Sequence, residues 1–191
     1  MSLREYKLIF TGSMGAGKTT AIAAISEIAP VRTDVLNTDL AGSSKATTTT
    51  ALDYGEVTLS GGDKLRLYGT PGQARFDFMW KILGEGALGV IVLVDNTRPD
   101  PIADMRGYLS AFREIVSGSR AVVGIGRTDT HPLPALEAFH AASVEFGLTT
   151  PILSIDVRRR EDVLLLVDVL LHQIEVAEAT GPASFQGAPC Q

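Results

Sequence analysis

The sequence predicts a single α/β domain with a mixed, mostly parallel six-stranded sheet and helices on both faces. Short apolar runs alternate with longer amphipathic segments, which is the pattern of strands joined by crossover helices. The length of 191 residues suits one domain with a sizeable core. One antiparallel hairpin, residues 51–68 with its turn at Gly61-Gly62, is expected at the edge of the sheet.

The expected strands and helices follow from the spacing of the apolar residues. The six strands are residues 6–10, 51–60, 64–68, 88–94, 121–125 and 152–155. The helices are residues 18–28, 102–116, 134–146 and 161–174. Between the first helix and the hairpin, residues 31–50 are polar, and we expect them to form a long loop.

We expect residues 1–176 to form the domain and residues 177–191, in which Ala, Gly, Pro and Gln dominate, to form a disordered tail. The formal net charge of −5 argues against a nucleic-acid-binding protein. The single cysteine excludes a disulfide framework and a cysteine-based zinc cluster. The sequence shows neither a signal peptide nor a membrane-spanning run, so we expect a cytoplasmic protein without a membrane anchor.

An eight-residue motif after the first strand carries the clearest chemical signal. Residues 12–19 match GxxxxGK[ST] in full, between an apolar strand and a helix, as this motif requires. The glycines let backbone N–H groups point at phosphate oxygens, and the helix N-terminus adds its positive dipole end. The motif and the threonine after it supply the expected nucleotide contacts: Gly12, Ser13, Met14, Gly15, Ala16, Gly17, Lys18, Thr19 and Thr20.

Two side chains of this motif have particular roles in the expected site. Lys18 supplies a positive charge to the β- and γ-phosphates, and Thr19 supplies a hydroxyl ligand for Mg²⁺. The sequence therefore predicts a protein that binds a nucleoside triphosphate together with Mg²⁺.

The segment after the third strand narrows the class of nucleotide-binding protein. Residues 68–73, Tyr-Gly-Thr-Pro-Gly-Gln, resemble the DxxGQ segment of Ras-like small GTPases. With Leu-Asp-Tyr-Gly at 52–55 and Val-Asp-Asn-Thr-Arg-Pro-Asp at 94–100, the chain resembles bacterial small GTPases of the gliding-motility (Mgl) type. The resemblance covers about residues 6–175, nearly the whole expected domain.

The resemblance implies a Ras-like domain that binds GTP and GDP, hydrolyses GTP with Mg²⁺, and acts as a conformational switch for a protein partner. Beside Lys18, it implies catalytic roles for Gly72, whose N–H contacts the γ-phosphate, and Gln73, which orients the attacking water. A roadblock-domain regulator and an effector are the expected partners. The family's aspartate at the start of DxxGQ is Gly69 here, so this position lacks the acidic group on the Mg²⁺ side.

The resemblance also implies a second hydroxyl ligand for Mg²⁺ from the polar loop. Residues 47–50 are four consecutive threonines. Thr49 is the expected ligand because it precedes Asp53 by four residues, the spacing of small-GTPase loops that enter their second strand.

Base recognition is expected after the strand at 121–125, where Ras-like proteins have Asn-Lys-x-Asp and this chain has Gly126-Arg127-Thr128-Asp129. The Asp129 carboxylate matches the N1–H and N2 amino donors of guanine. The side chain of Arg127 covers the base. Val157, placed by position alone, offers its backbone N–H to guanine O6.

Two other functions remain open at the level of the sequence. In a P-loop ATPase or small-molecule kinase, Asp95 would be the Walker B ligand of Mg²⁺, and Gly69 would need no explanation. A hydrolysis-deficient adaptor that keeps its nucleotide is favoured by Gly69 and Gly126. Base preference separates the first from a GTPase, and a single-turnover assay separates the second.

Overall fold

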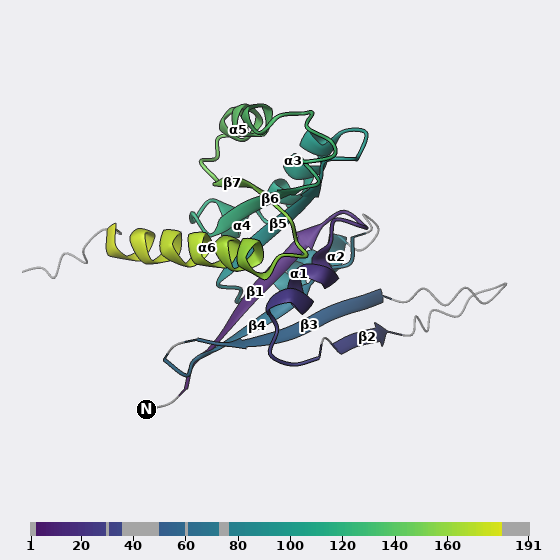
Figure 1. Ribbon diagram of the computed structural model, residues 1–191. Coiled ribbons are helices and arrows are strands. Elements are labelled where there is room, and N and C mark those ends of the chain that lie inside the picture. Colours follow the sequence, from purple (N-terminus) through teal and green to yellow (C-terminus); the bar gives the residue numbers. More distant parts are fainter. Residues whose placement is uncertain (1–2, 30, 36–49, 60, 73–76, 181–191) are drawn as a thin grey trace, which may run out of the picture.

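The computed structural model describes residues 3–29, 31–35, 50–59, 61–72 and 77–180 (Figure 1). Its strands are β1 (Glu5–Gly12), β2 (Val31–Val35), β3 (Thr50–Thr58), β4 (Lys64–Gly69), β5 (Gly89–Asp95), β6 (Ala121–Gly126) and β7 (Ile152–Ile155). Its helices are α1 (Lys18–Ile25), α2 (Asp77–Gly84), α3 (Pro101–Ala111), α4 (Arg113–Val116), α5 (Leu136–Glu145) and α6 (Arg160–Thr180).

The strands of the described residues form one seven-stranded sheet in the order β2-β3-β4-β1-β5-β6-β7. Strand β1 pairs in parallel with both β4 and β5, and β5-β6 and β6-β7 are also parallel. The pairs β2-β3 and β3-β4 are antiparallel. The predicted α/β class with a mostly parallel sheet is confirmed.

Six strands were predicted, whereas the described residues form a sheet of seven. Residues 31–35, Val-Arg-Thr-Asp-Val, lie in the stretch expected to be a loop, yet they form β2 and pair with β3. A strand at the sheet edge pairs on one side, so backbone hydrogen bonds hold it without the continuous apolar run that identifies a central strand. The β3-β4 hairpin consequently lies one strand in from the edge.

Alternate residues of the central strands pack on opposite faces of the sheet. On one face, Ile9 and the even-numbered residues 90–94 join α3 and α5, with Phe139 fully buried. On the other face, Leu8 and Phe10 of β1 and Ile91 and Leu93 of β5 join α1 and α6. Helices therefore cover both faces, as predicted, and Figure 1 shows α1 and α6 away from α3 and α5.

Three predicted helix boundaries were wrong. Helix α1 ends at Ile25 because Ser26 has extended backbone, with ψ of 138°. The helix expected over residues 102–116 is interrupted at Phe112 and forms α3 and α4. Helix α6 continues to Thr180, so residues 177–180, which we expected in the tail, are helical, and the rest of that tail lies outside the described residues. No helix in the described part of the chain is both long enough and apolar enough to cross a membrane.

Phe139 tests the packing of α5 against the sheet. Its side chain has 0% exposure, so Phe139→Ala should leave a cavity and lower the free energy of unfolding by about 3–5 kcal/mol. Val144→Ala on the same helix is the matched control, because Val144 is 68% exposed and should change stability by less than about 0.5 kcal/mol. Urea denaturation measures both values, and equal losses in the two variants would contradict the packing described.

Candidate functional site

The phosphate loop lies between β1 and α1, at the carboxyl end of the central strand. Gly12 and Gly17 both have positive φ, 143° and 93°. A Cβ on Gly12 would lie 2.1 Å from the carbonyl oxygen of Leu93, and one on Gly17 would lie 2.6 Å from Cγ2 of Val157. The two glycines therefore allow both a backbone turn and the close approach of neighbouring elements that no other residue permits.

Lys18 is enclosed by the loop it belongs to. Its Nζ donates hydrogen bonds to the carbonyl oxygens of Gly12 and Ser13, both at 2.8 Å, and the residue is 8% exposed. Burial lowers the pKa of Lys18 to about 8, against the opposing effect of the Asp53 carboxylate. The ammonium is therefore held in a desolvated position, where its attraction for phosphate oxygens is strong.

Asp53 is a site residue whose role the sequence analysis missed. Its carboxylate Oδ2 accepts a hydrogen bond of 2.5 Å from Thr19 Oγ1, and Asp53 is buried. In the β3-β4 register Asp53 lies opposite Gly69, and a Cβ on Gly69 would lie 3.0 Å from Asp53 Cβ and 3.2 Å from Oδ2. The Asp53 carboxylate therefore occupies the space beside Gly69, the position that lacks an acidic side chain. An acidic residue between Leu52 and Tyr54 in a strand was the available signal.

The Thr19 hydroxyl and the Asp53 carboxylate form a pair of oxygen donors suited to a hard divalent cation. Mg²⁺ is typically held by one or two such protein groups, with water and phosphate oxygens completing the octahedron. The donor chemistry therefore fits the expected Mg²⁺. Among the described residues, no group of three or more His, Cys, Asp or Glu side chains forms a separate metal site.

Gly72 lies directly against the phosphate loop, as its expected role requires. A Cβ on this residue would lie 2.5 Å from the backbone nitrogen of Met14 and 2.8 Å from Lys18 Nζ. Trp80 Nε1 donates a hydrogen bond of 2.9 Å to the carbonyl oxygen of the preceding Pro71. The expected water-orienting residue Gln73 and the expected Mg²⁺ ligand Thr49 lie outside the described residues, so their roles stay predictions.

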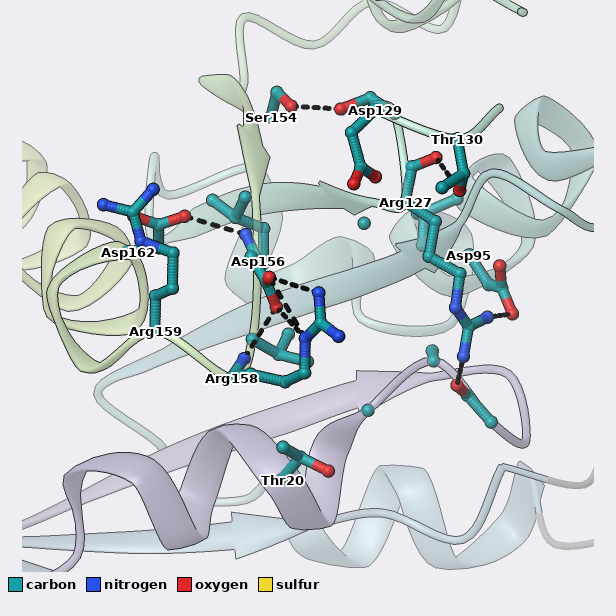
Figure 2. A pocket seen from close by; sticks show the side chains of 18 residues that line it. Thr20, Asp95, Arg127, Asp129, Thr130, Ser154, Asp156, Arg158, Arg159 and Asp162 are labelled. Carbon is teal, nitrogen blue, oxygen red and sulfur yellow. Dashed lines mark hydrogen bonds and ion pairs between the residues drawn. The ribbon is translucent and has the colours of Figure 1, made fainter. Parts of the chain in front are cut away.

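A cavity of about 710 Å³ continues from the phosphate loop to the residues predicted to recognise the base (Figure 2). Gly15, Ala16, Gly17 and Thr20 line one end, and the rest is lined by the carboxyl ends of β5, β6 and β7, by the loops after β6 and β7, and by Asp162 of α6. The fold thus brings together three residues predicted from two separate segments: Arg127 and Asp129 from one, and Val157 from the other. In Figure 2 the Asp129 carboxylate points into this cavity.

Two charged residues of the loop after β7, Asp156 and Arg158, flank Val157 and also line the cavity. Arg158 donates to the Asp156 carboxylate from its backbone nitrogen at 2.9 Å and from Nη2 at 2.6 Å. The Arg158 side-chain hydrogen bonds lower the pKa of Asp156 to about 2. This local ion pair keeps the Arg158 guanidinium beside the cavity, where it adds positive charge near Asp129.

Asp95, the residue considered as a Walker B aspartate, contacts Arg127 and Thr97. Its Oδ2 pairs with Arg127 Nη1, and its Oδ1 accepts from Thr97 Oγ1 at 2.7 Å. Thr19, the expected metal ligand, is instead bonded to Asp53. The two carboxylates therefore serve different parts of the site.

Comparison with known proteins supports nucleotide binding by a P-loop protein. Residues 38–130 match the model of a family described as conserved hypothetical ATP binding protein. An uncharacterized protein of Methanocaldococcus jannaschii is 32% identical over 99 residues, 51% of this chain and 56% of the relative. The Ras-related protein RabC of Dictyostelium discoideum is 22% identical over 176 residues, 89% of this chain and 84% of that protein. The chain thus spans little more than half the length of the first relative.

The buried Lys18 makes stability depend on pH in a defined direction. Its pKa is about 8 in the folded chain and 10.5 when unperturbed, so the unfolded state holds more protons between these values. The cost of burying the ammonium is fully present below pH 8 and is lifted as the pH rises toward 10.5.

Lys18→Met removes that cost, so its unfolding free energy should exceed that of the natural protein at pH 7 by an amount on the order of 3 kcal/mol. The excess should shrink steadily by pH 10, as followed by urea denaturation of both proteins. All other titrating groups are common to the two chains. A difference that stays constant from pH 7 to pH 10 would show that Lys18 is not desolvated.

Proposed function

We propose that this protein is a small GTPase that binds GTP and GDP with Mg²⁺, hydrolyses GTP, and acts as a conformational switch. One observation carries the proposal: a single cavity is lined both by residues of a complete phosphate loop and by the carboxylate residue Asp129. The distant similarity to a Ras-related protein over most of the chain supports the same class.

The preference for guanine rests on hydrogen-bond matching at Asp129. Its carboxylate offers only acceptors, which suit the N1–H and N2 amino donors of guanine. Adenine presents an unprotonated N1 on the same edge, and this acceptor would face the carboxylate oxygens. The apolar stem of Arg127 lies along the cavity and supplies a face for the base. The backbone N–H of Val157 is the proposed donor to guanine O6.

The residues around the phosphates supply charge and orientation. Lys18 Nζ exchanges its two carbonyl partners for oxygens of the β- and γ-phosphates, and the Gly72 N–H donates to the γ-phosphate. Gln73 orients the attacking water. Thr19 and Thr49 would supply hydroxyl ligands to Mg²⁺, and Asp53 would supply the acidic group absent from Gly69. The cation would add positive charge that stabilises the phosphates during hydrolysis.

The resemblance to the Mgl type extends the proposal to partners. A roadblock-domain protein would regulate the switch, and an effector would bind one of its two conformations. The γ-phosphate orders the loops that contact it, and hydrolysis releases them, so a partner can distinguish the GTP-bound from the GDP-bound protein.

An ATP-dependent enzyme is the second candidate, because the matching family model is described as ATP binding. In that case Asp95 would hold Mg²⁺, and adenine would bind more tightly than guanine. Nucleotide competition separates the two candidates, and a single-turnover assay then separates a GTPase from a hydrolysis-deficient adaptor.

Asp129→Asn tests base recognition. Asparagine replaces one acceptor by a donor, which would face the N2 amino group of guanine but suits the carbonyl oxygen of xanthine. GTP should bind more weakly and XTP more tightly, with a combined change of about 3–5 kcal/mol. Competition titration of both proteins with the two nucleotides measures this. An unaltered GTP-to-XTP ratio would remove Asp129 from base recognition.

Asp53→Asn tests the metal side of the site. The variant keeps the side-chain volume but removes the negative charge beside Thr19. The tightening of GDP binding by Mg²⁺, measured against EDTA, should decrease at least about tenfold, because cation ligation favours carboxylate oxygens. The double variant Asp53→Gly/Gly69→Asp moves the carboxylate to β4 and should restore much of this effect. Full Mg²⁺ dependence in Asp53→Asn would show that Asp53 has no part in metal binding.

A further inference from the structure

Asp95 is a buried carboxylate at the carboxyl end of β5, next to the phosphate loop. It is 6% exposed, and both of its oxygens have partners. Oδ1 accepts from the backbone nitrogen and the hydroxyl of Thr97 at 3.0 and 2.7 Å, and Oδ2 pairs with Arg127 Nη1. Burial raises the pKa of Asp95, but the hydrogen bonds from Arg127 and Thr97 outweigh it and leave the pKa below its ordinary value. Asp95 is therefore a charged, fully paired group.

Arg127 reaches two separate parts of the site at once. Its backbone φ is 64°, a left-handed conformation that is uncommon for arginine. While Nη1 pairs with Asp95, Nη2 donates a hydrogen bond of 3.1 Å to the carbonyl oxygen of Gly15. The guanidinium therefore links the end of β5 and the loop after β6 to the phosphate loop, as the dashed lines in Figure 2 show.

The preceding residue explains why such a link matters in this chain. Gly126 has no side chain with which to reach the phosphate loop, and a Cβ there would have no neighbour closer than Val94 O at 3.6 Å. The planar fork of arginine bonds two acceptors in fixed directions, which lysine cannot reproduce. Asp95 determines the direction of this fork because it is the buried half of the ion pair, whereas the Arg127 side chain is 49% exposed.

We propose that Asp95 is a positioning residue for nucleotide binding. It holds the Arg127 guanidinium against the Gly15 carbonyl and so keeps the loop after β6 and the phosphate loop at a fixed separation. This inference rests on the proposed nucleotide function of the cavity. A nucleotide gains from the fixed spacing because its base and its phosphates bind at the two ends. A ligand that contacts the phosphate loop alone gains little.

Asp95→Asn is the test, because asparagine keeps the volume and the acceptor for Thr97 but loses the charge that holds Arg127. Calorimetry should show GDP binding weakened at least about tenfold, and binding of inorganic pyrophosphate changed less than about threefold. The weakening of GDP binding should be the same in Mg²⁺ and in EDTA. Asp104→Asn, which breaks the exposed pair of Arg98 and Asp104 at 2.8 Å, is the matched control and should change neither ligand.

Arg127→Lys provides an independent variant that leaves Asp95 in place. It should weaken GDP binding to a similar degree, and the double variant should be no weaker than the worse single one, since both changes break the same link. Purely additive losses would overturn the proposal. So would unchanged GDP binding in Asp95→Asn, an equal loss for GDP and pyrophosphate, or a loss that vanishes in EDTA, which would make Asp95 a Mg²⁺ ligand.

A comparison of ADP with GDP distinguishes failure of the proposed function from failure of this inference. If the natural protein binds ADP more tightly than GDP, the guanine assignment fails. The same comparison of Asp95→Asn with its control is then made with ADP and pyrophosphate. A selective loss of ADP binding would still support the positioning role.

Discussion

The position of β1 between β4 and β5 is the constraint on which the rest of the site depends. All three strands run in parallel, so their carboxyl ends meet at one edge of the sheet. The phosphate loop leaves β1 at that edge, Gly72 arrives shortly after β4, and Asp95 ends β5. The cavity forms there because, at the ends of parallel strands, loops from distant parts of the sequence converge around helix N-termini.

Two carboxylates divide the surroundings of the phosphate loop between them. Asp53, from the antiparallel side of the sheet, bonds Thr19, while Asp95, from the parallel side, pairs with Arg127. Each is buried, and each is satisfied by a partner on another segment, which is the condition under which a buried charge is tolerated. Among the described residues, the Lys18 ammonium bonds the carbonyl oxygens of Gly12 and Ser13 and no carboxylate, so its positive charge is available for phosphate.

The sequence predicted the parts of this arrangement that depend on local pattern. The phosphate loop and the central strands follow from a motif and from apolar runs, and Asp129 and Val157 do line one cavity with it. Strand β2 was not predicted because its sequence lacks the continuous apolar run that identifies a strand. Backbone hydrogen bonds to β3 hold it in the sheet instead. The contacts of Asp53 with Thr19 and of Asp95 with Arg127 could not be predicted from the sequence. They depend on the pairing register of β3 with β4 and on the left-handed backbone of Arg127, which the local sequence pattern does not reveal.

The β3-β4 register places Asp53 opposite Gly69, so an acidic side chain at either position would lie in the same part of the site. Asp53 and Gly69 face each other across two paired strands, and the missing side chain of one leaves room for the carboxylate of the other. Two aspartates at these positions would crowd each other, because a Cβ on Gly69 would lie 3.0 Å from Asp53 Cβ, and their carboxylates would repel each other. Two glycines would leave the Thr19 hydroxyl without its acidic partner. One aspartate and one glycine is therefore the stable combination, and either strand can carry the aspartate. Under the proposed function, the Asp53 carboxylate therefore supplies the acidic group that Gly69 lacks.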